Sequence, residues 1–152
     1  MIQKLGIILL LIGLTSADGV AQSPRKVTRL RIVKTEFLGY REYVITDSTI
    51  RVEIHDVATT DSLLVRKLTS VERNQLLTSL DQVYLSGLKS SYQGKSTDTD
   101  MPGYTFTVVK GSFVKQINLY EYRLRCLYDV SVKLDALLPE AFRLNYATNT
   151  AK

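Results

Sequence analysis

One stretch of eight residues constrains the fold more than any other part of the chain. In "TIRVEIHD", residues 49–56, apolar side chains alternate strictly with charged or polar ones. The apolar set is Ile50, Val52 and Ile54, and the polar set is Arg51, Glu53 and His55. A period of two is typical of a strand with one face buried and the other in water. The chain must therefore build an antiparallel sheet that something else covers on one side.

Neighbouring segments supply the other strands. Residues 27–37 and 40–46 alternate in the same way, and the turn-forming pair Asp47-Ser48 predicts an antiparallel hairpin between 40–46 and 49–56. "SLLVRKL", residues 62–68, is a candidate for a short further strand. Residues 103–109 and 112–122 flank Lys110-Gly111, and because Gly111 tolerates the positive φ of a tight turn, they predict a second hairpin.

Two segments have helical spacing instead. Residues 69–84 begin with Thr69 and Glu72 in a capping-box pattern, and residues 123–138 stop at Pro139. The first stripe is Leu76, Leu77, Leu80, Val83 and Tyr84; the second is Leu124, Leu127, Val130, Leu134, Leu137 and Leu138. The order is β-β-β-α-β-β-α. We therefore expect an α+β fold: a single antiparallel sheet of about five strands with two helices packed on one face.

The N-terminus has the pattern of a secretory signal. Lys4 precedes an apolar core at residues 5–14, and Gly19 and Ala21 stand at the −3 and −1 positions of a cleavage site before Gln22. The apolar core is shorter than the roughly 20 residues that a bilayer requires. The sequence predicts a signal peptide at 1–21, a single domain at 22–146 and a flexible tail at 147–152. An uncleaved N-terminal anchor is the alternative. We expect a periplasmic or extracellular protein without a stable membrane span after cleavage.

The net charge indicates a class of partner, and the cysteine count limits the possible disulfides. The chain carries 20 Lys and Arg against 15 Asp and Glu, a net charge of +5. In an exported protein this excess favours anionic surfaces, glycans or acidic partners over nucleic acid, with solubility alone as the alternative. Cys126 is the only cysteine, which excludes an intramolecular disulfide and indicates a buried thiol rather than an intermolecular link.

Residues 94–100, "GKSTDTD", resemble parts of two known loops but complete neither. A phosphate-binding loop needs its first glycine at position 89, which is Lys89. A calcium loop of EF-hand type needs an oxygen ligand where Pro102 stands and a glutamate where Val109 stands. We therefore expect no cofactor. Residues 85–102 have no periodicity, and a loop of that length is a candidate functional loop; its candidate residues are Tyr92, Lys95, Asp98, Asp100 and Met101.

Catalytic patterns are absent from the sequence. His55 is the only histidine, no G-x-S-x-G motif occurs, and nothing places Cys126 near His55. One His and one Cys also supply too few ligands for the usual zinc sites. The sequence therefore predicts a protein that is not an enzyme.

Tyrosine is the unusual part of the composition: nine Tyr accompany four Phe and no Trp. Tyrosine favours partly hydrated contact surfaces because it joins apolar area to a polar tip. If the helices cover the other side, one open sheet face collects Arg29, Arg31, Arg51, His55, Tyr120 and Tyr122. Such a face suits an acidic envelope protein or an anionic glycan. An ordinary exposed face is the alternative, and export argues against an RNA-binding sheet.

The arrangement of short motifs resembles small exported domains of unknown function from Gram-negative cell envelopes. The matching positions are Gly39 with Tyr43 and Ile45, Asp100 with Pro102, and Gly111 with Val114, within residues 30–138. The Cys-Pro pair that often follows the first glycine of those domains is Tyr40-Arg41 here. The resemblance implies the fold and no particular chemistry.

Three functions are consistent with these patterns. The first is an exported, non-catalytic binding or interaction module of the cell envelope. The second is a carrier or sensor of a small ligand, which needs a cavity between sheet and helices. The third and most remote is a hydrolase, which needs His55 or two carboxylates gathered in a cleft.

Overall fold

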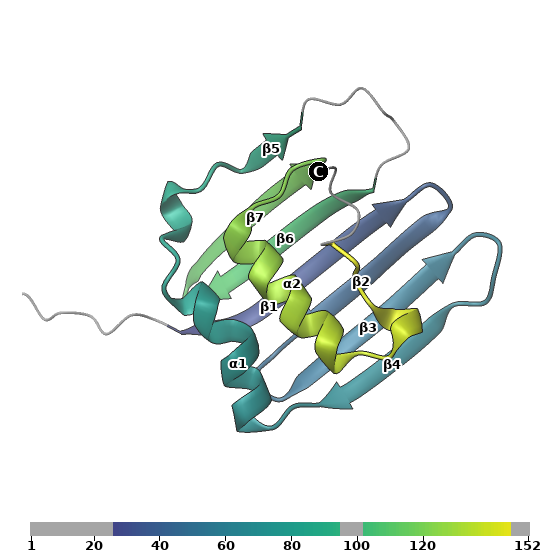
Figure 1. The fold of residues 1–152 in the computed structure, drawn as a ribbon, viewed down its shortest axis with the longest axis horizontal. Coiled ribbons are helices and arrows are strands. Elements are labelled where there is room, and N and C mark those ends of the chain that lie inside the picture. Colours follow the sequence, from purple (N-terminus) through teal and green to yellow (C-terminus); the bar gives the residue numbers. More distant parts are fainter. Residues whose placement is uncertain (1–25, 95–101, 147–152) are drawn as a thin grey trace, which may run out of the picture.

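The computed structural model describes residues 26–94 and 102–146. The predicted signal peptide, the tail at 147–152 and four of the candidate loop residues, Lys95, Asp98, Asp100 and Met101, lie outside the described residues. The described chain forms one sheet with two α-helices (Figure 1). Its strands are β1 (Val27–Glu36), β2 (Gly39–Ile45), β3 (Thr49–Asp56), β4 (Ser62–Lys67), β5 (Ser91–Gln93), β6 (Gly103–Lys110) and β7 (Phe113–Tyr120).

The sheet is larger than the sequence predicts, and it is mixed. Its seven strands follow the order β4-β3-β2-β1-β6-β7-β5, and every pairing is antiparallel except that of β5 with β7. The expectation of about five strands in a purely antiparallel sheet, in the order β-β-β-α-β-β-α, is therefore wrong. Both predicted hairpins are present: β2 pairs with β3, and β6 pairs with β7.

The strand that makes the sheet mixed is too short to show a period. β5 has three residues and lies inside the segment that the sequence presents as an unpatterned loop. Backbone bonds hold it beside β7: the Asn118 amide donates to the Ser90 carbonyl at 2.9 Å, and the Gly94 amide donates to the Tyr120 carbonyl at 2.8 Å. Such a pairing joins residues distant in sequence, so local spacing carries no signal of it.

Both helices lie on the same face of the sheet (Figure 1). Helix α1 (Ser70–Asp81) begins with the predicted capping box, in which the Thr69 hydroxyl accepts from the Glu72 amide and the Glu72 carboxylate accepts from the Thr69 amide. Helix α2 (Arg125–Leu137) follows β7 and contacts α1. Two short 3-10 turns, Leu85–Gly87 and Glu140–Phe142, follow the two helices.

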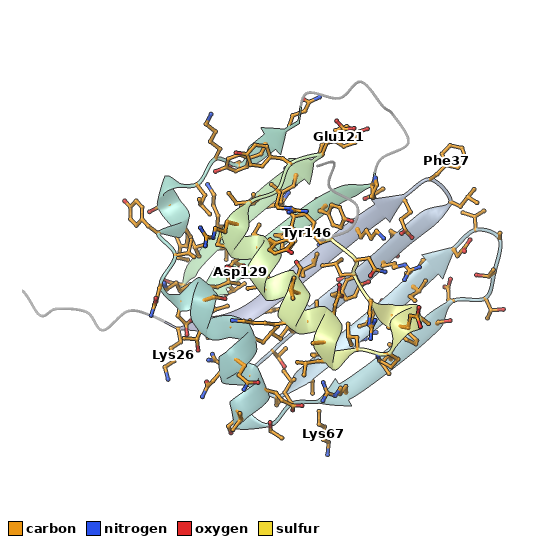
Figure 2. All side chains as sticks on the ribbon, in the orientation of Figure 1. Lys26, Phe37, Lys67, Glu121, Asp129 and Tyr146 are labelled. Atoms are coloured by element: carbon orange, nitrogen blue, oxygen red, sulfur yellow. The ribbon has the colours of Figure 1, made fainter. Side chains whose placement is uncertain are left out.

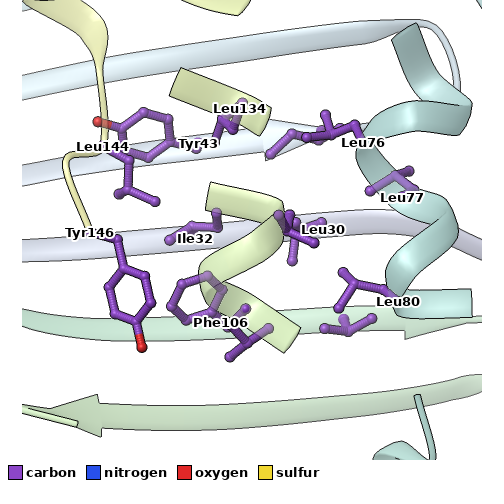
Figure 3. Packing of buried hydrophobic residues seen from close by; sticks show 14 of the residues in the cluster. Leu30, Ile32, Tyr43, Leu76, Leu77, Leu80, Phe106, Leu134, Leu144 and Tyr146 are labelled. Atoms are coloured by element: carbon purple, nitrogen blue, oxygen red, sulfur yellow. The ribbon is translucent and has the colours of Figure 1, made fainter. Parts of the chain in front are cut away.

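The core fills the space between the sheet and the helices (Figure 3). The alternation in β1, β2, β3 and β6 places every second side chain under the helices, as the period-two pattern predicts. Fully buried members include Leu30, Ile32, Tyr43, Ile45, Ile50, Val52, Phe106, Leu76, Leu80 and Leu134. One strand position breaks the pattern of apolar burial: Lys34, only 4% exposed, lies on this face and pairs with Glu36 at 2.6 Å.

Helix α1 ends three residues earlier than the sequence predicts. Its last residue is Asp81, and Tyr84, which the helical stripe placed in the core, is 79% exposed. The Val83 amide bonds the Leu80 carbonyl at 3.1 Å, so the chain closes the helix tightly and then turns toward β5. The apolar stripe places Tyr84 wrongly, because the spacing of apolar residues does not show where the chain leaves the helix.

The chain after α2 also packs into the core, which the helical pattern did not indicate. Leu144 and Tyr146 are fully buried. The Asp135 carboxylate accepts from the amides of Leu144 at 2.6 Å and Asn145 at 2.9 Å. The Tyr146 ring lies edge-on to Phe106, with ring centres 5.6 Å apart. These contacts hold the C-terminal segment against the helix-covered face of the sheet.

Candidate functional site

The face of the sheet opposite the helices carries most of the predicted interaction residues. We call it the open face, because neither α-helix lies on it (Figure 1). The strand registers assign its side chains: Arg29, Arg31, Val33, Thr35, Tyr40, Glu42, Val44, Arg51, Glu53, His55, Leu63, Val65, Lys67, Thr105, Thr107, Val109, Val114, Gln116, Asn118 and Tyr120. Each of these positions alternates with a core position on the same strand.

Charge on the open face is arranged in bands that run across the strands. Arg31 on β1 and Arg51 on β3 share one cross-strand row, separated by Val44. The next row carries Glu42 opposite Glu53. Neither band is visible in the linear sequence, because register alone brings like charges from separate strands together.

At the basic end, Arg29 and Lys67 lie two residues beyond the row of Arg31 and Arg51, on β1 and β4. We call Arg29, Arg31, Arg51 and Lys67 the basic band. Figure 2 shows Lys67 projecting from the sheet beside β4. Three of these four residues belong to the predicted interaction face. Lys67 was not predicted, because it lies on a short edge strand.

The acidic row compensates part of the basic band. Arg31 and Glu42 form an ion pair at 2.6 Å, and Arg51 pairs with Glu53. Arg29 and Lys67 form no ion pair with another described residue. The open face is therefore less uniformly basic than the sequence suggests, and its free positive charge concentrates at one end.

His55 occupies the row beyond the acids. Its ring stacks on Tyr40 with 4.4 Å between ring centres, and its Nδ1 lies 2.9 Å from Asp61. Partial desolvation acts to lower its pKa, but hydrogen bonds with Asp61 and Glu53 outweigh it and raise the pKa above the ordinary value. These two carboxylates thus favour a protonated, positively charged His55.

The backbone under this stack explains Gly39. A Cβ added at Gly39 would lie 1.9 Å from the His55 carbonyl oxygen, so only glycine lets β2 begin this close to β3. The glycine that carries part of the motif resemblance is therefore required by close strand packing.

The two predicted tyrosines separate. Tyr120 has open-face register, opposite Gly103. Tyr122 lies past the end of β7, after Glu121 takes a φ of 51° and breaks the alternation. Its ring stacks on Tyr92 of β5, 5.0 Å between centres, and Tyr92 is in register with the buried Leu119. Tyr122 therefore belongs with the covered side.

Tyr92 is the one candidate loop residue that the structure describes. It is half-buried against the core, and its hydroxyl accepts from the Lys89 amide at 2.9 Å. These contacts anchor β5 to the body of the domain. Tyr92 therefore has a packing role.

The part of the open face formed by β6 and β7 is polar and uncharged. The Thr105 hydroxyl donates to the Asn118 side-chain oxygen at 3.1 Å, and the Gln116 amide reaches the same oxygen at 3.3 Å. Beside them Val109 pairs with Val114 across the two strands. This half has neither the bands nor the ion pairs of the β1–β4 half.

The groups considered for catalysis do not meet. His55 lies on the open face, whereas Cys126 is half-buried on α2 and packs against the core on the other side of the sheet. Burial raises the pKa of the Cys126 thiol, which disfavours the reactive thiolate. Within residues 26–94 and 102–146, no group of three or more His, Cys, Asp and Glu side chains is placed to hold a metal ion.

Three hollows lined by described residues are open to solvent. One lies between Thr28, Asp47 and α1, and another lies beside α2 near Asp135 and Arg143. A third lies beside β7, between Val114, Gln116 and Ser90. None of the three lies between the sheet and the helices, where a ligand carrier needs its cavity.

Comparison with known proteins gives no family for this chain: no protein-family model matches it, and no curated protein matches it either. Among the described helices, none is both long and apolar enough to cross a membrane. What this protein binds must therefore be inferred from the geometry of its open face.

Proposed function

We propose that this protein is an exported, non-catalytic interaction module of the cell envelope, and that it binds an acidic surface of another protein through its open face. The observation that carries the proposal is the basic band, Arg29, Arg31, Arg51 and Lys67, on a sheet face that neither helix covers. Export is inferred from the signal pattern at residues 1–21.

The size of the open face suits a protein partner. Its six strands, β1–β4, β6 and β7, each occupy a width of about 4.8 Å and together span about 29 Å, and seven or eight residues at about 3.3 Å each span about 25 Å. The product is about 700 Å², close to the roughly 800 Å² that each partner contributes to a standard interface. The composition also fits, because Tyr and Arg are enriched where proteins meet.

The charges of the basic band favour an acidic partner. Arg31 and Arg51 already have carboxylate partners, whereas Arg29 and Lys67 are free to pair with an incoming acid. Exposed pairs of this kind each contribute at most about 1 kcal/mol and mainly accelerate and orient the encounter. We therefore expect binding that weakens as salt concentration rises.

Two observations favour this function over the other hypotheses. A carrier needs a cavity between sheet and helices, and the described residues there form a close-packed core of 22 buried hydrophobic side chains. A hydrolase needs His55 beside a nucleophile, and Cys126 lies on the opposite side of the sheet. Two carboxylates in a cleft remain the remote form of the hydrolase hypothesis.

The test compares two variants of equal charge. In the first, Arg29, Arg31 and Arg51 become Gln; in the matched control, Lys89, Arg125 and Lys133, which are exposed and lie outside the open face, become Gln. Each protein is produced from the full sequence with a C-terminal tag, and a photo-crosslinking residue replaces Val44. Crosslinking is carried out with envelope extract of the producing organism.

We expect a discrete protein adduct with the unmodified open face and with the control, and its loss in the triple Arg variant. Equal adducts from both variants, or an adduct formed only when the crosslinker replaces Val132 on α2, would overturn the proposal. Immobilised polyglutamate and heparin provide a second comparison. Retention on heparin alone would assign the basic band to an anionic glycan instead of an acidic protein.

A further inference from the structure

Strand β4 forms one edge of the sheet, and among the described residues no strand pairs with its outer side. The Leu68 amide bonds the Ser48 carbonyl of the β3 side at 2.8 Å. Backbone groups in an antiparallel pair alternate in direction, so those of Leu63, Val65 and Lys67 point away from β3. The edge therefore presents unpaired N–H and C=O groups, the template on which another strand can add.

The same residues leave apolar area in water. Leu63 and Val65 are each 59% exposed, and both lie on the open face. Sheets usually protect such an edge with charge, a bulge or a covering loop. Lys67 supplies one charge at the end of β4, and Asp61 supplies the opposite charge just before its start. The Asp61 side chain contacts His55 of its own copy at 2.9 Å and is still 64% exposed, so it can also face a lysine of a second copy.

We propose that β4 pairs antiparallel with β4 of a second copy of this chain, which joins the two sheets into one. In the register centred on Leu64, Leu63 of one copy faces Val65 of the other, and Asp61 faces Lys67. By the same alternation, the backbone groups of Asp61 also point away from β3. Each facing pair can therefore form two backbone hydrogen bonds between the copies. A twofold axis gives every contact twice.

Charge complementarity selects this register over its neighbours. Centring the pairing on Leu63 sets Asp61 opposite Val65, and centring it on Val65 sets Leu63 opposite Lys67. In either case both charges lose their partner and an apolar side chain faces a charge. Cross-strand pairs stabilise a sheet when two apolar side chains or two opposite charges face each other. Only the register centred on Leu64 gives every outward-facing residue of β4 such a partner.

The pairing has a consequence for the open face. A twofold axis perpendicular to the sheet keeps both open faces on the same side, so Arg29, Arg31 and Arg51 of the two copies lie on one continuous surface, while Lys67 of each copy pairs with Asp61 of the other. The contact involves little more than one strand per copy and is smaller than a standard interface. We therefore expect a reversible dimer with a dissociation constant in the micromolar range, about 10–100 µM.

Sedimentation equilibrium on the protein produced from its full sequence tests the pairing, with loading from about 1 to 300 µM. Asp61→Lys and Lys67→Asp each place like charges opposite one another at both ends of the interface. Each should raise the dissociation constant about tenfold or more. The double variant, Asp61→Lys with Lys67→Asp, restores opposite charges and should return it to within about threefold of the original.

Val65→Pro blocks the edge in another way. It removes an N–H that points outward and leaves the ladder to β3 intact, which is where an edge strand accepts proline. We expect a folded monomer at every concentration. Far-UV circular dichroism checks the fold, and the charge-swap series decides the question if this variant unfolds.

Three results would overturn the proposal. They are a monomer at 300 µM, single charge reversals that dimerise as well as the original, or a double variant as weak as the singles. A dimer that survives Val65→Pro but is lost in the triple Arg variant of the basic band would place self-association on the open face and not on β4.

Discussion

We expect the hydroxyl of Tyr146 to stabilise the fold through two hydrogen bonds. It donates to the Tyr122 carbonyl at 2.8 Å and accepts from the Leu124 amide at 3.1 Å. Leu124 is the residue before α2, and its own side chain makes no capping hydrogen bond. The Tyr146 hydroxyl therefore satisfies one of the amides that a helix start leaves unpaired, and it ties the C-terminal segment to the end of β7.

Tyr146→Phe isolates this contribution. The ring is fully buried and keeps its edge-on contacts with Tyr104 and Phe106 (Figure 3), so no cavity forms. The substitution leaves a buried N–H and a C=O without their partner, at about 1–3 kcal/mol for each buried group. Because water reaches the half-exposed Tyr122 segment, we expect a total loss of about 2 kcal/mol in the free energy of unfolding.

Urea unfolding followed by far-UV circular dichroism measures this loss. The midpoint should fall while the urea dependence stays constant, since the surface exposed on unfolding hardly changes. The melting temperature should drop by about 6–10 °C. Tyr84→Phe is the matched control, because Tyr84 is 79% exposed, and it should change stability by less than about 0.5 kcal/mol. Equal stability of the two variants would refute the assigned role of the hydroxyl.

The same residue predicts a pH dependence. Burial raises the pKa of Tyr146 to about 12, whereas the unfolded chain titrates near 10. A pKa raised by folding contributes stability that is full below pH 10 and is lost as pH rises toward 12. Tyr146→Phe lacks this contribution. The stability gap between the natural chain and the variant should therefore narrow between pH 10 and 12, and a constant gap would contradict the assignment.

The remaining predictions concern the sheet and α1. Gly39→Ala should destabilise the fold by about 1–3 kcal/mol because its Cβ meets backbone at 1.9 Å, whereas Gly103→Ala, with no atom within 4 Å, should be nearly neutral in the same urea assay. His55 is the only histidine, so proton NMR of an untagged sample gives its pKa directly; we expect a value above 6.5 that falls in Asp61→Asn. Stability linked to this shift is present below the unfolded pKa and lost as pH rises through the folded one. Arg73→Met removes a buried guanidinium from a strand carbonyl 2.7 Å away and should cost about 2 kcal/mol by thermal melting; a change under 0.5 kcal/mol would show that bond to be unimportant.

Local pattern was sufficient for the elements that are long and regular. The alternation at 49–56, the capping box at Thr69 and Glu72, and the glycine turn at Gly111 each record a contact between near neighbours, and the structure has all three. The side of each strand that faces the core followed from the same period. These features depend on spacings of two to four residues, which a sequence displays directly.

The mixed sheet and the site depended on contacts between distant residues. β5 adds to β7 through bonds that join Ser90 to Asn118, and a three-residue strand has no period to detect. The end of α1, which exposes Tyr84, is set by where the chain must turn, and spacing does not record that.

Alternation in the sequence is enough to assign residues to one face of each strand: basic at 29, 31 and 51, acidic at 42 and 53. Pairing between strands then brings these charges into two bands, lets Glu42 and Glu53 neutralise part of the basic band, and leaves Tyr122 turned away from Tyr120. Strand register causes this difference. Shifting one strand by a single residue moves every side chain to the opposite face, and cohesion of the whole core fixes that register.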